Sequence, residues 1–268
     1  MSKGVGCWTV LAIVLVASWA AGAGAGAPMP MTGSNTQGTS LAGSLTDEPM
    51  NVLVWSVSVD PDGLGSTCVP LIDSRGNVYV TSVSNTRNFF KYDPDGNLLW
   101  SRGIGNGIYG QGCLGEYGET TYWYVPVHFG ESGAVCKLDA ATGDTVWTVD
   151  ILSSVAGEAP AMDQCQLIID AAGDIYFPTA DGQVHKVEDM GSSGSEVWRT
   201  RTGCSPPNGM GKVAMSTDES VVYNVIGGGA DDGGIVQAGG DQGLGPGRRE
   251  HCVVGSMRWG SQRGAVSL

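Results

Sequence analysis

Two short acidic segments hold the residues of this chain that are best suited to bind a metal ion. The segments Asp60–Gly63 and Asp93–Gly96 both read Asp-Pro-Asp-Gly, and carboxylate oxygens at such short spacing suit Ca²⁺. Neither segment continues into a full calcium-binding loop with its terminal Glu. Pro followed by Asp-Gly is also an ordinary turn sequence. The sequence therefore favours two tight turns over two calcium sites, and we expect no metal ligands.

Histidine and cysteine form no recognisable catalytic or zinc-binding motif. The chain has only three His, and His128 and His185 lie in expected strands without an evident nucleophile partner. We interpret both as residues of a strand surface rather than as general bases. No two Cys have Cys-x-x-Cys spacing, which leaves a zinc site unsupported, and no Gly-x-Ser-x-Gly segment indicates a hydrolase. We therefore expect no catalytic residue.

The elements that carry these residues repeat along the chain. Four segments end in Trp after an apolar or β-favouring stretch, at Trp55, Trp100, Trp147 and Trp198. Their spacings are 45, 47 and 51 residues, and a period in this range is typical of propeller blades or solenoid repeats. A Trp that recurs once per blade is expected to pack between neighbouring blades. Stacking of one of them on a ligand is the alternative.

Each repeat also contains two hairpins. The first is clearest at Leu71–Val80 and Ile168–Phe177, which share the pattern Asp-x-x-Gly-x-Val/Ile-Tyr. Ala214–Tyr223 is a weaker copy, and Gly118–Val125 takes its place in the second repeat. The second hairpin follows, and its last strand carries the Trp. Alternating residues with Asp and Gly at the turns predict four antiparallel strands in each repeat, which is the composition of a propeller blade.

One of these hairpins is specific enough to indicate a family. The segment Leu138–Trp147, with the sequence Leu-Asp-Ala-Ala-Thr-Gly-Asp-Thr-Val-Trp, resembles the signature of the pyrroloquinoline-quinone (PQQ)-like propeller repeat. The Asp-x-x-Gly-x-Val/Ile-Tyr element resembles the other half of that repeat. The resemblance covers residues 51–226. It implies an all-β fold, an incomplete β-propeller of about three to four four-stranded antiparallel blades.

The resemblance leaves more than one function open. PQQ-dependent dehydrogenases are much longer, and several use adjacent Cys residues and a Ca²⁺ held by Glu, Asn and Asp. This chain has no adjacent Cys pair, and its acidic residues do not match those ligand positions. We therefore expect a non-catalytic binding or scaffold protein without a cofactor, like the outer-membrane assembly scaffolds of the repeat family. The alternatives are a fragment of a PQQ-dependent alcohol or sugar dehydrogenase, which would need PQQ and calcium, and a nonfunctional truncated product.

The first 25 residues have the pattern of an export signal. Lys3 precedes the apolar run Val10–Trp19, and small residues follow, with favoured cleavage after Ala25. The run is short for a membrane span; an uncleaved anchor is the alternative. Residues 26–50 are rich in Gly, Ser, Thr and Pro and are expected to form a flexible linker. We therefore expect a secreted or periplasmic protein without a stable membrane span.

Charge restricts the classes of partner. The chain carries 27 Asp and Glu against 14 Lys and Arg, a formal net charge of −13. An acidic surface of this kind repels nucleic acid and anionic lipid. We therefore expect protein or peptide partners and no nucleic acid.

The cysteines are expected to reflect the compartment. Six of the seven Cys follow the signal segment, and an exported protein with an even number of Cys can form disulfides. Cys68 and Cys113 each lie 13 residues after a repeated Trp, so we expect them at equivalent blade positions. We expect oxidation of some Cys but no particular pair.

The repeat pattern fades after Ile226. Residues 227–234 form a Gly-rich run, and no Leu-Asp-x-x-Thr-Gly turn follows. Gly loses the most backbone entropy on ordering, so residues 227–268 are expected to be a poorly ordered tail. Their four Arg contrast with the acidic repeats, which also fits a frame error that replaced the next blade.

Overall fold

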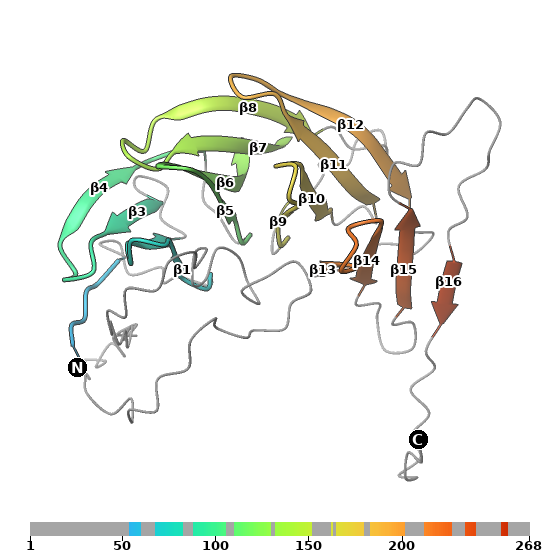
Figure 1. The fold of residues 1–268 in the computed structure, drawn as a ribbon, viewed down its shortest axis with the longest axis horizontal. Coiled ribbons are helices and arrows are strands. Elements are labelled where there is room, and N and C mark those ends of the chain that lie inside the picture. Colours follow the sequence, from blue (N-terminus) through green and yellow to red (C-terminus); the bar gives the residue numbers. More distant parts are fainter. Residues whose placement is uncertain are drawn as a thin grey trace, which may run out of the picture.

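Four antiparallel sheets make up the regular structure of the described part of the protein. The computed structural model describes residues 54–59, 68–82, 88–105, 110–129, 132–151, 162, 165–179, 183–201, 212–226, 234–239 and 253–256. Every sheet has four strands, and the sheets follow one another along an open arc (Figure 1). Among the described residues there is no helix, and hence none long and apolar enough to span a membrane. The predicted all-β fold with four strands per repeat is confirmed.

Each sheet is a consecutive part of the chain, and we call the sheets blades 1 to 4. Blade 1 contains β1 (Leu71–Ile72), β2 (Val78–Thr81), β3 (Phe89–Tyr92) and β4 (Leu98–Arg102). Blade 2 contains β5 (Cys113–Tyr117), β6 (Thr120–Phe129), β7 (Ser132–Asp139) and β8 (Thr145–Ile151). Blade 3 contains β9 (Ile168–Ile169), β10 (Ile175–Pro178), β11 (Gln183–Asp189) and β12 (Gly194–Arg201). Blade 4 contains β13 (Lys212–Met215), β14 (Val221–Ile226), β15 (Gly234–Gly239) and β16 (Val253–Ser256).

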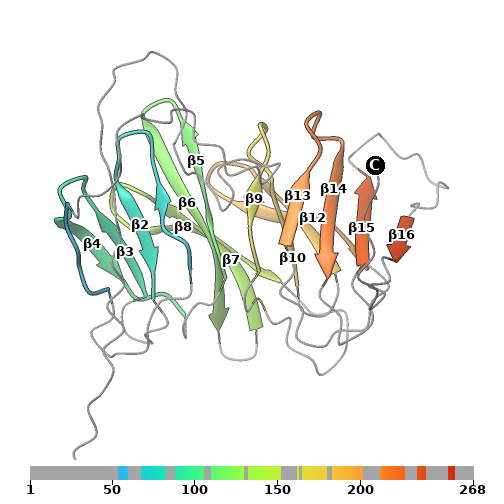
Figure 2. The same ribbon diagram turned by 90° about the horizontal axis from the view of Figure 1, so that it is seen from below.

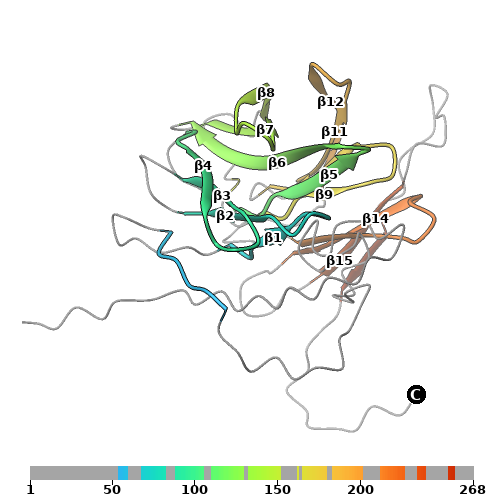
Figure 3. The same cartoon turned by 60° about the vertical axis from the view of Figure 1, so that its left-hand side comes forward.

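Strand order in every blade follows the chain. In blades 1 to 3 the first strand lies on the concave side of the arc and the fourth strand on its outer rim (Figure 1). Figures 2 and 3 show the same succession of blades from two other sides. Blades 1 and 4 stand at opposite ends of the arc, so the propeller is incomplete.

The core consists of apolar layers between consecutive blades. Between blades 1 and 2, Tyr79 and Phe89 meet the indole of Trp123 edge-on, with ring centroids 5.3 and 5.2 Å apart. A second, larger cluster joins blades 2, 3 and 4 and includes Ile175 and Val213. Because each blade covers its neighbour, the layers hold the blades in a fixed order.

A shared register explains how one sequence pattern builds three similar blades. In blades 1 to 3 a Tyr, a Lys and a Trp lie opposite one another on the second, third and fourth strands, as Tyr79-Lys91-Trp100, Tyr124-Lys137-Trp147 and Tyr176-Lys186-Trp198. The pairing register between the third and fourth strands shifts immediately after each of these Lys residues. One extra residue on the outermost strand therefore lies in a β-bulge: Leu99, Val146 or Val197.

Blade 4 continues beyond the boundary expected at Ile226. Strand β14 pairs with β15, and β15 pairs with β16. A strand edge can be paired by the backbone of any extended segment, including a Gly-containing one, and Ile235-Val236 favours the extended form. The sheet therefore extends into the expected tail, and the boundary at Ile226 is corrected. Residues 227–233, 240–252 and 257–268 lie outside the described residues.

Candidate functional site at the blade junctions and outer rim

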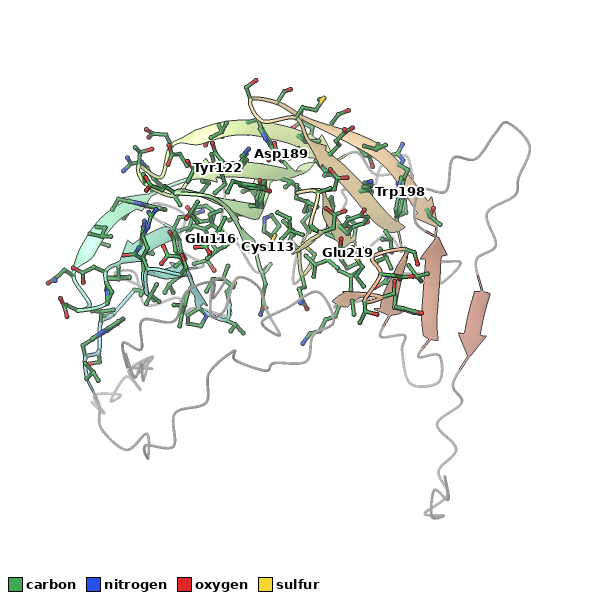
Figure 4. The ribbon with its side chains drawn as sticks, in the orientation of Figure 1. Cys113, Glu116, Tyr122, Asp189, Trp198 and Glu219 are labelled. Atoms are coloured by element: carbon green, nitrogen blue, oxygen red, sulfur yellow. The ribbon has the colours of Figure 1, made fainter. Side chains whose placement is uncertain are left out.

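Trp55 and Trp100 lie against the hairpin turn of the blade that follows each of them in the chain. Trp55 Nε1 donates to the Pro94 carbonyl at 2.9 Å, and Trp100 Nε1 donates to the Ala140 carbonyl at 3.1 Å. Trp198 is partly buried against the cluster shared by blades 2 to 4 (Figure 4). These Trp side chains therefore pack between blades, as predicted.

A buried polar cluster joins blades 2 and 3 at Asp189 (Figure 4). The Asp189 carboxylate accepts hydrogen bonds from Lys137 Nζ at 2.6 Å, from the Tyr124 hydroxyl at 2.6 Å and from Trp147 Nε1 at 3.0 Å. Lys137 Nζ also lies 3.8 Å from the centroid of the Tyr122 ring. The side chains of Lys137 and Asp189 are 2% and 6% exposed, so this ion pair is almost fully removed from water.

The electrostatics of this cluster favour a structural ion pair. Burial alone would raise the pKa of Asp189, but hydrogen bonds from Lys137, Tyr124 and Trp147 outweigh it and hold the pKa below its ordinary value. Burial and the hydrogen bond to Asp189 raise the pKa of the Tyr124 hydroxyl. Near neutral pH the carboxylate is therefore charged and the phenol neutral, and neither is set to exchange a proton.

Acidic side chains also join the turns of neighbouring blades. Glu116 Oε1 accepts hydrogen bonds from both the N–H and the hydroxyl of Ser74, each at 2.9 Å. Glu219 accepts one from the Ala171 N–H at 3.1 Å (Figure 4). Glu219 itself has a φ of 56°, a left-handed conformation that Glu rarely adopts. These carboxylates are therefore engaged in holding blades together.

The Asp93–Gly96 segment is a turn in which the first carboxylate is already used. Asp93 Oδ1 accepts the N–H groups of Asp95 and Asn97 at 3.0 and 2.8 Å, and Asp93 Oδ2 accepts the Asn97 amide at 2.9 Å. The hydrogen bonds from Asn97 lower the pKa of Asp93. The described part of the chain has no group of three His, Cys, Asp or Glu placed to hold a metal ion. The Asp60–Gly63 segment lies outside it.

His185 is not a strand-surface residue, contrary to the sequence interpretation. Its ring is fully buried and lies parallel to the Phe177 ring, with centroids 5.1 Å apart. Nε2 lies 2.9 Å from Thr179 Oγ1, and Nδ1 lies 2.7 Å from Glu196 Oε1. Both ring nitrogens therefore have a partner inside blade 3, which is why a polar side chain is tolerated there. His128 lies on β6, and its side chain lies outside the described part.

The described cysteines form no disulfide with one another. This holds for Cys68, Cys113, Cys136 and Cys165, so the expected oxidation is not found as a bond within this group. Burial raises the pKa of Cys136 to about 11 and also raises that of Cys113, which keeps both in the unreactive thiol form at neutral pH. Two further cysteines lie outside the described part, Cys204 and Cys252.

Cys68 and Cys113 do not occupy equivalent positions. Cys113 lies opposite the repeated Tyr of its blade, where blade 1 has Leu71. Cys68 precedes β1 instead, and its Sγ donates to the Gly110 carbonyl at 3.0 Å. The links between blades differ in length, because surface connections tolerate insertions. The two cysteines are equally far from a Trp in the sequence, but they do not occupy the same position in their blades.

The outer rim carries an apolar side chain on each of the first three blades. The bulge residues Leu99, Val146 and Val197 are 51%, 36% and 47% exposed. Each bulge residue stands directly before the Trp of its blade. Val54 stands in the same way before Trp55, and it is 57% exposed. We call these four residues the rim stripe. The sequence pattern could have indicated the stripe, since an apolar residue precedes every repeated Trp, but only the structure shows that these side chains are exposed.

One family model and several solved structures are similar to this chain. The model of the family described as outer membrane protein assembly factor BamB matches residues 91–236. No curated protein matches the chain. Among solved structures, BamB from Moraxella catarrhalis is 17% identical, with a TM-score of 0.45, over 70% of this chain and 50% of that one. A protein of unknown function from Dyadobacter fermentans is 14% identical, with a TM-score of 0.43, over 75% of this chain and 66% of that one.

The chain thus spans about half the length of the BamB structure that it matches. The residues matched by the family model run from β3 of blade 1 into β15 of blade 4, and they include the complete Tyr-Lys-Trp registers of blades 2 and 3. Because that match covers more than half of the 268 residues, the chain belongs to the PQQ-like repeat family of outer membrane protein assembly factor BamB.

Proposed function

We propose that this protein is an exported, non-catalytic β-propeller scaffold that binds protein partners outside the cytoplasm. The family membership supports a scaffold role, since the family is described as an assembly factor of outer membrane proteins. The net charge of −13 favours protein over nucleic acid as the partner. The proposal includes no cofactor, because the acidic side chains described above are used in turns and blade junctions.

The rim stripe is the observation that carries this proposal. Its exposed apolar side chains recur at successive blades, and we infer that together they form an interaction surface. Bulges also disfavour direct pairing of another strand with an edge. The partner is therefore expected to dock through apolar side chains that contact the stripe and not through strand addition.

Mutation of the rim stripe should remove partner binding without unfolding the blades. We expect the double variant Val146→Ser, Val197→Ser to lose complexes that the unmodified protein forms in the cell envelope. Truncation of central apolar contacts weakens an interface by about tenfold or more. The measurement is site-specific photo-crosslinking from position 146 in cells, followed by identification of the adduct by mass spectrometry.

Val69 provides a matched control, since it is 39% exposed and apolar but lies just before β1, a strand on the concave side of the arc. A photo-crosslinker at position 69 should give no discrete adduct, and Val69→Ser should retain the complexes. Equal adducts from positions 146 and 69, or complexes that survive the double variant, would contradict binding at the rim.

Export is tested at the N-terminus. We expect the mature protein in the extracytoplasmic fraction to begin near Gly26, because small residues follow the apolar run Val10–Trp19 directly. N-terminal sequencing of that fraction is the measurement, and a variant that lacks residues 10–19 should stay in the cytoplasm. Recovery of an intact Met1 from the exported protein would speak against cleavage.

A further inference from the structure

An exposed carboxylate accompanies the rim stripe on each of the first three blades. Asp95 lies in the turn before β4, Asp150 lies on β8, and Glu188 lies on β11, where it pairs with a residue of β12. All three side chains are exposed, and each stands within a few residues of the stripe residue of its blade. We call Asp95, Asp150 and Glu188 the rim carboxylates.

The described cations of the fourth strands lie beside other carboxylates. Arg102 Nη2 on β4 is 3.4 Å from Asp144 Oδ1, and Arg199 Nη1 on β12 is 3.9 Å from Glu196 Oε2. Within the part of the chain that the structure describes, no ion pair involves a rim carboxylate. Each of the three blades therefore presents an exposed apolar side chain and, near it, a carboxylate without a cation.

This combination restricts the chemistry of a partner that covers the stripe. A purely apolar partner surface would remove water from the carboxylates without supplying a hydrogen-bond donor, which costs free energy. An acidic partner surface would be repelled by the carboxylates and by the net charge of −13 that the chain carries. Lys or Arg beside the apolar groups of the partner avoids both costs, and the same net charge attracts such a partner over a longer distance.

We propose that the rim stripe binds a polypeptide segment in which apolar residues are flanked by Lys or Arg. This inference rests on the proposed function, because it specifies the partner of the same rim. The apolar residues of the segment contact the stripe, and its basic side chains pair with the rim carboxylates. Exposed ion pairs contribute little affinity each, so the apolar contacts hold the segment while the charges select it among other apolar segments.

Three labelled synthetic peptides of equal length test this proposal by fluorescence anisotropy with the purified protein. The first alternates Leu with Lys, the second Leu with Glu, and the third Ser with Lys. We expect the Leu–Lys peptide to bind about tenfold or more tightly than either of the others. Raising the salt concentration from about 0.1 to about 1 M should weaken its binding, because the screening length falls from about 10 to about 3 Å.

Charge variants locate the contact on the rim. The triple variant Asp95→Asn, Asp150→Asn, Glu188→Gln should bind the Leu–Lys peptide about tenfold more weakly, as expected for three exposed ion pairs. Glu119→Gln is the matched control for each single substitution, because Glu119 is an exposed carboxylate in the turn between β5 and β6, the first two strands of blade 2. That control should bind the peptide like the unmodified protein. Far-UV circular dichroism checks that each variant is folded.

Equal binding of the Leu–Lys peptide and either of the other two would overturn this inference, and so would a triple variant that binds like the unmodified protein. The photo-crosslinked adduct from position 146 separates this result from the proposed function. An adduct that forms in cells with the same yield in the triple variant would leave the rim as a binding surface and exclude a basic partner. Absence of any adduct would contradict binding at the rim itself.

Discussion

Replacing Asp189 with alanine is expected to lower the free energy of unfolding by about 3–5 kcal/mol. The substitution removes the acceptor of Lys137, Tyr124 and Trp147 at once. Lys137 is left as a buried cation, since its side chain is only 2% exposed. An uncompensated buried charge is among the most costly defects that a single substitution can create. Urea denaturation followed by tryptophan fluorescence measures the change.

Asp150→Ala is the matched control, because Asp150 lies on the neighbouring strand β8 but is exposed. Its removal should change stability by no more than about 0.5 kcal/mol. The double variant Lys137→Met, Asp189→Ala removes both charges and should be more stable than Asp189→Ala alone. If the double variant is no more stable, desolvation of Lys137 is not the cause of the loss.

The pH dependence of the same variant follows from the lowered pKa of Asp189. A carboxyl whose pKa is lower in the folded state contributes stability above its unfolded pKa, about 3.9 for Asp, and loses that contribution as pH falls through the folded pKa. The stability difference between the unmodified protein and Asp189→Ala should therefore be full near neutral pH and shrink below about pH 4. A difference independent of pH would show that lost packing, and not the charge, dominates.

The sequence predicted the fold where the pattern repeats in phase. The Trp spacing and the hairpin motifs located β4, β8 and β12 as the Trp-bearing strands. This was possible because each motif encodes one local feature, either a turn or a packed indole. The Asp189 cluster was not predictable in this way. Lys137 and Asp189 are 52 residues apart on different blades, and the equivalent Lys91 donates instead to a backbone carbonyl, that of Ala140.

Local composition misled the sequence interpretation at three other places. His185 is polar, so the sequence suggested a surface position, yet Thr179 and Glu196 satisfy both of its nitrogens in the interior. The Gly-rich run after Ile226 suggested the end of the repeats, but β15 pairs with β14 through the backbone. Cys68 and Cys113 were aligned by distance from the Trp, which links of unequal length do not preserve. In the first two cases a pairing partner inside the same blade decided the outcome, and in the third the length of the link did.

Gly143→Ala should be the more damaging of two formally identical glycine substitutions. Gly143 has a φ of +77°, and a Cβ at this position would lie 2.8 Å from the ring of Trp100 and 2.9 Å from Arg102. Gly191, in the corresponding turn of blade 3, has a φ of +85°, but a Cβ there would meet nothing within 4 Å. The two substitutions therefore share the cost of a left-handed alanine, about 1–2 kcal/mol. They differ in whether the new methyl group enters the junction between blades.

We accordingly expect Gly191→Ala to lower the free energy of unfolding only by that shared cost. Gly143→Ala should lower it by about 1–3 kcal/mol more, the cost of overpacking a tight contact. The additional loss should be accompanied by a change in the fluorescence of Trp100, because the methyl group must displace the indole that joins blade 1 to blade 2. Combining Gly143→Ala with Trp100→Ala tests the assignment, since removal of the ring should make the methyl group nearly harmless beyond its backbone strain. Equal losses at Gly143 and Gly191, or additive losses in the double variant, would show that the indole is free to move and that the turn of blade 2 does not hold it.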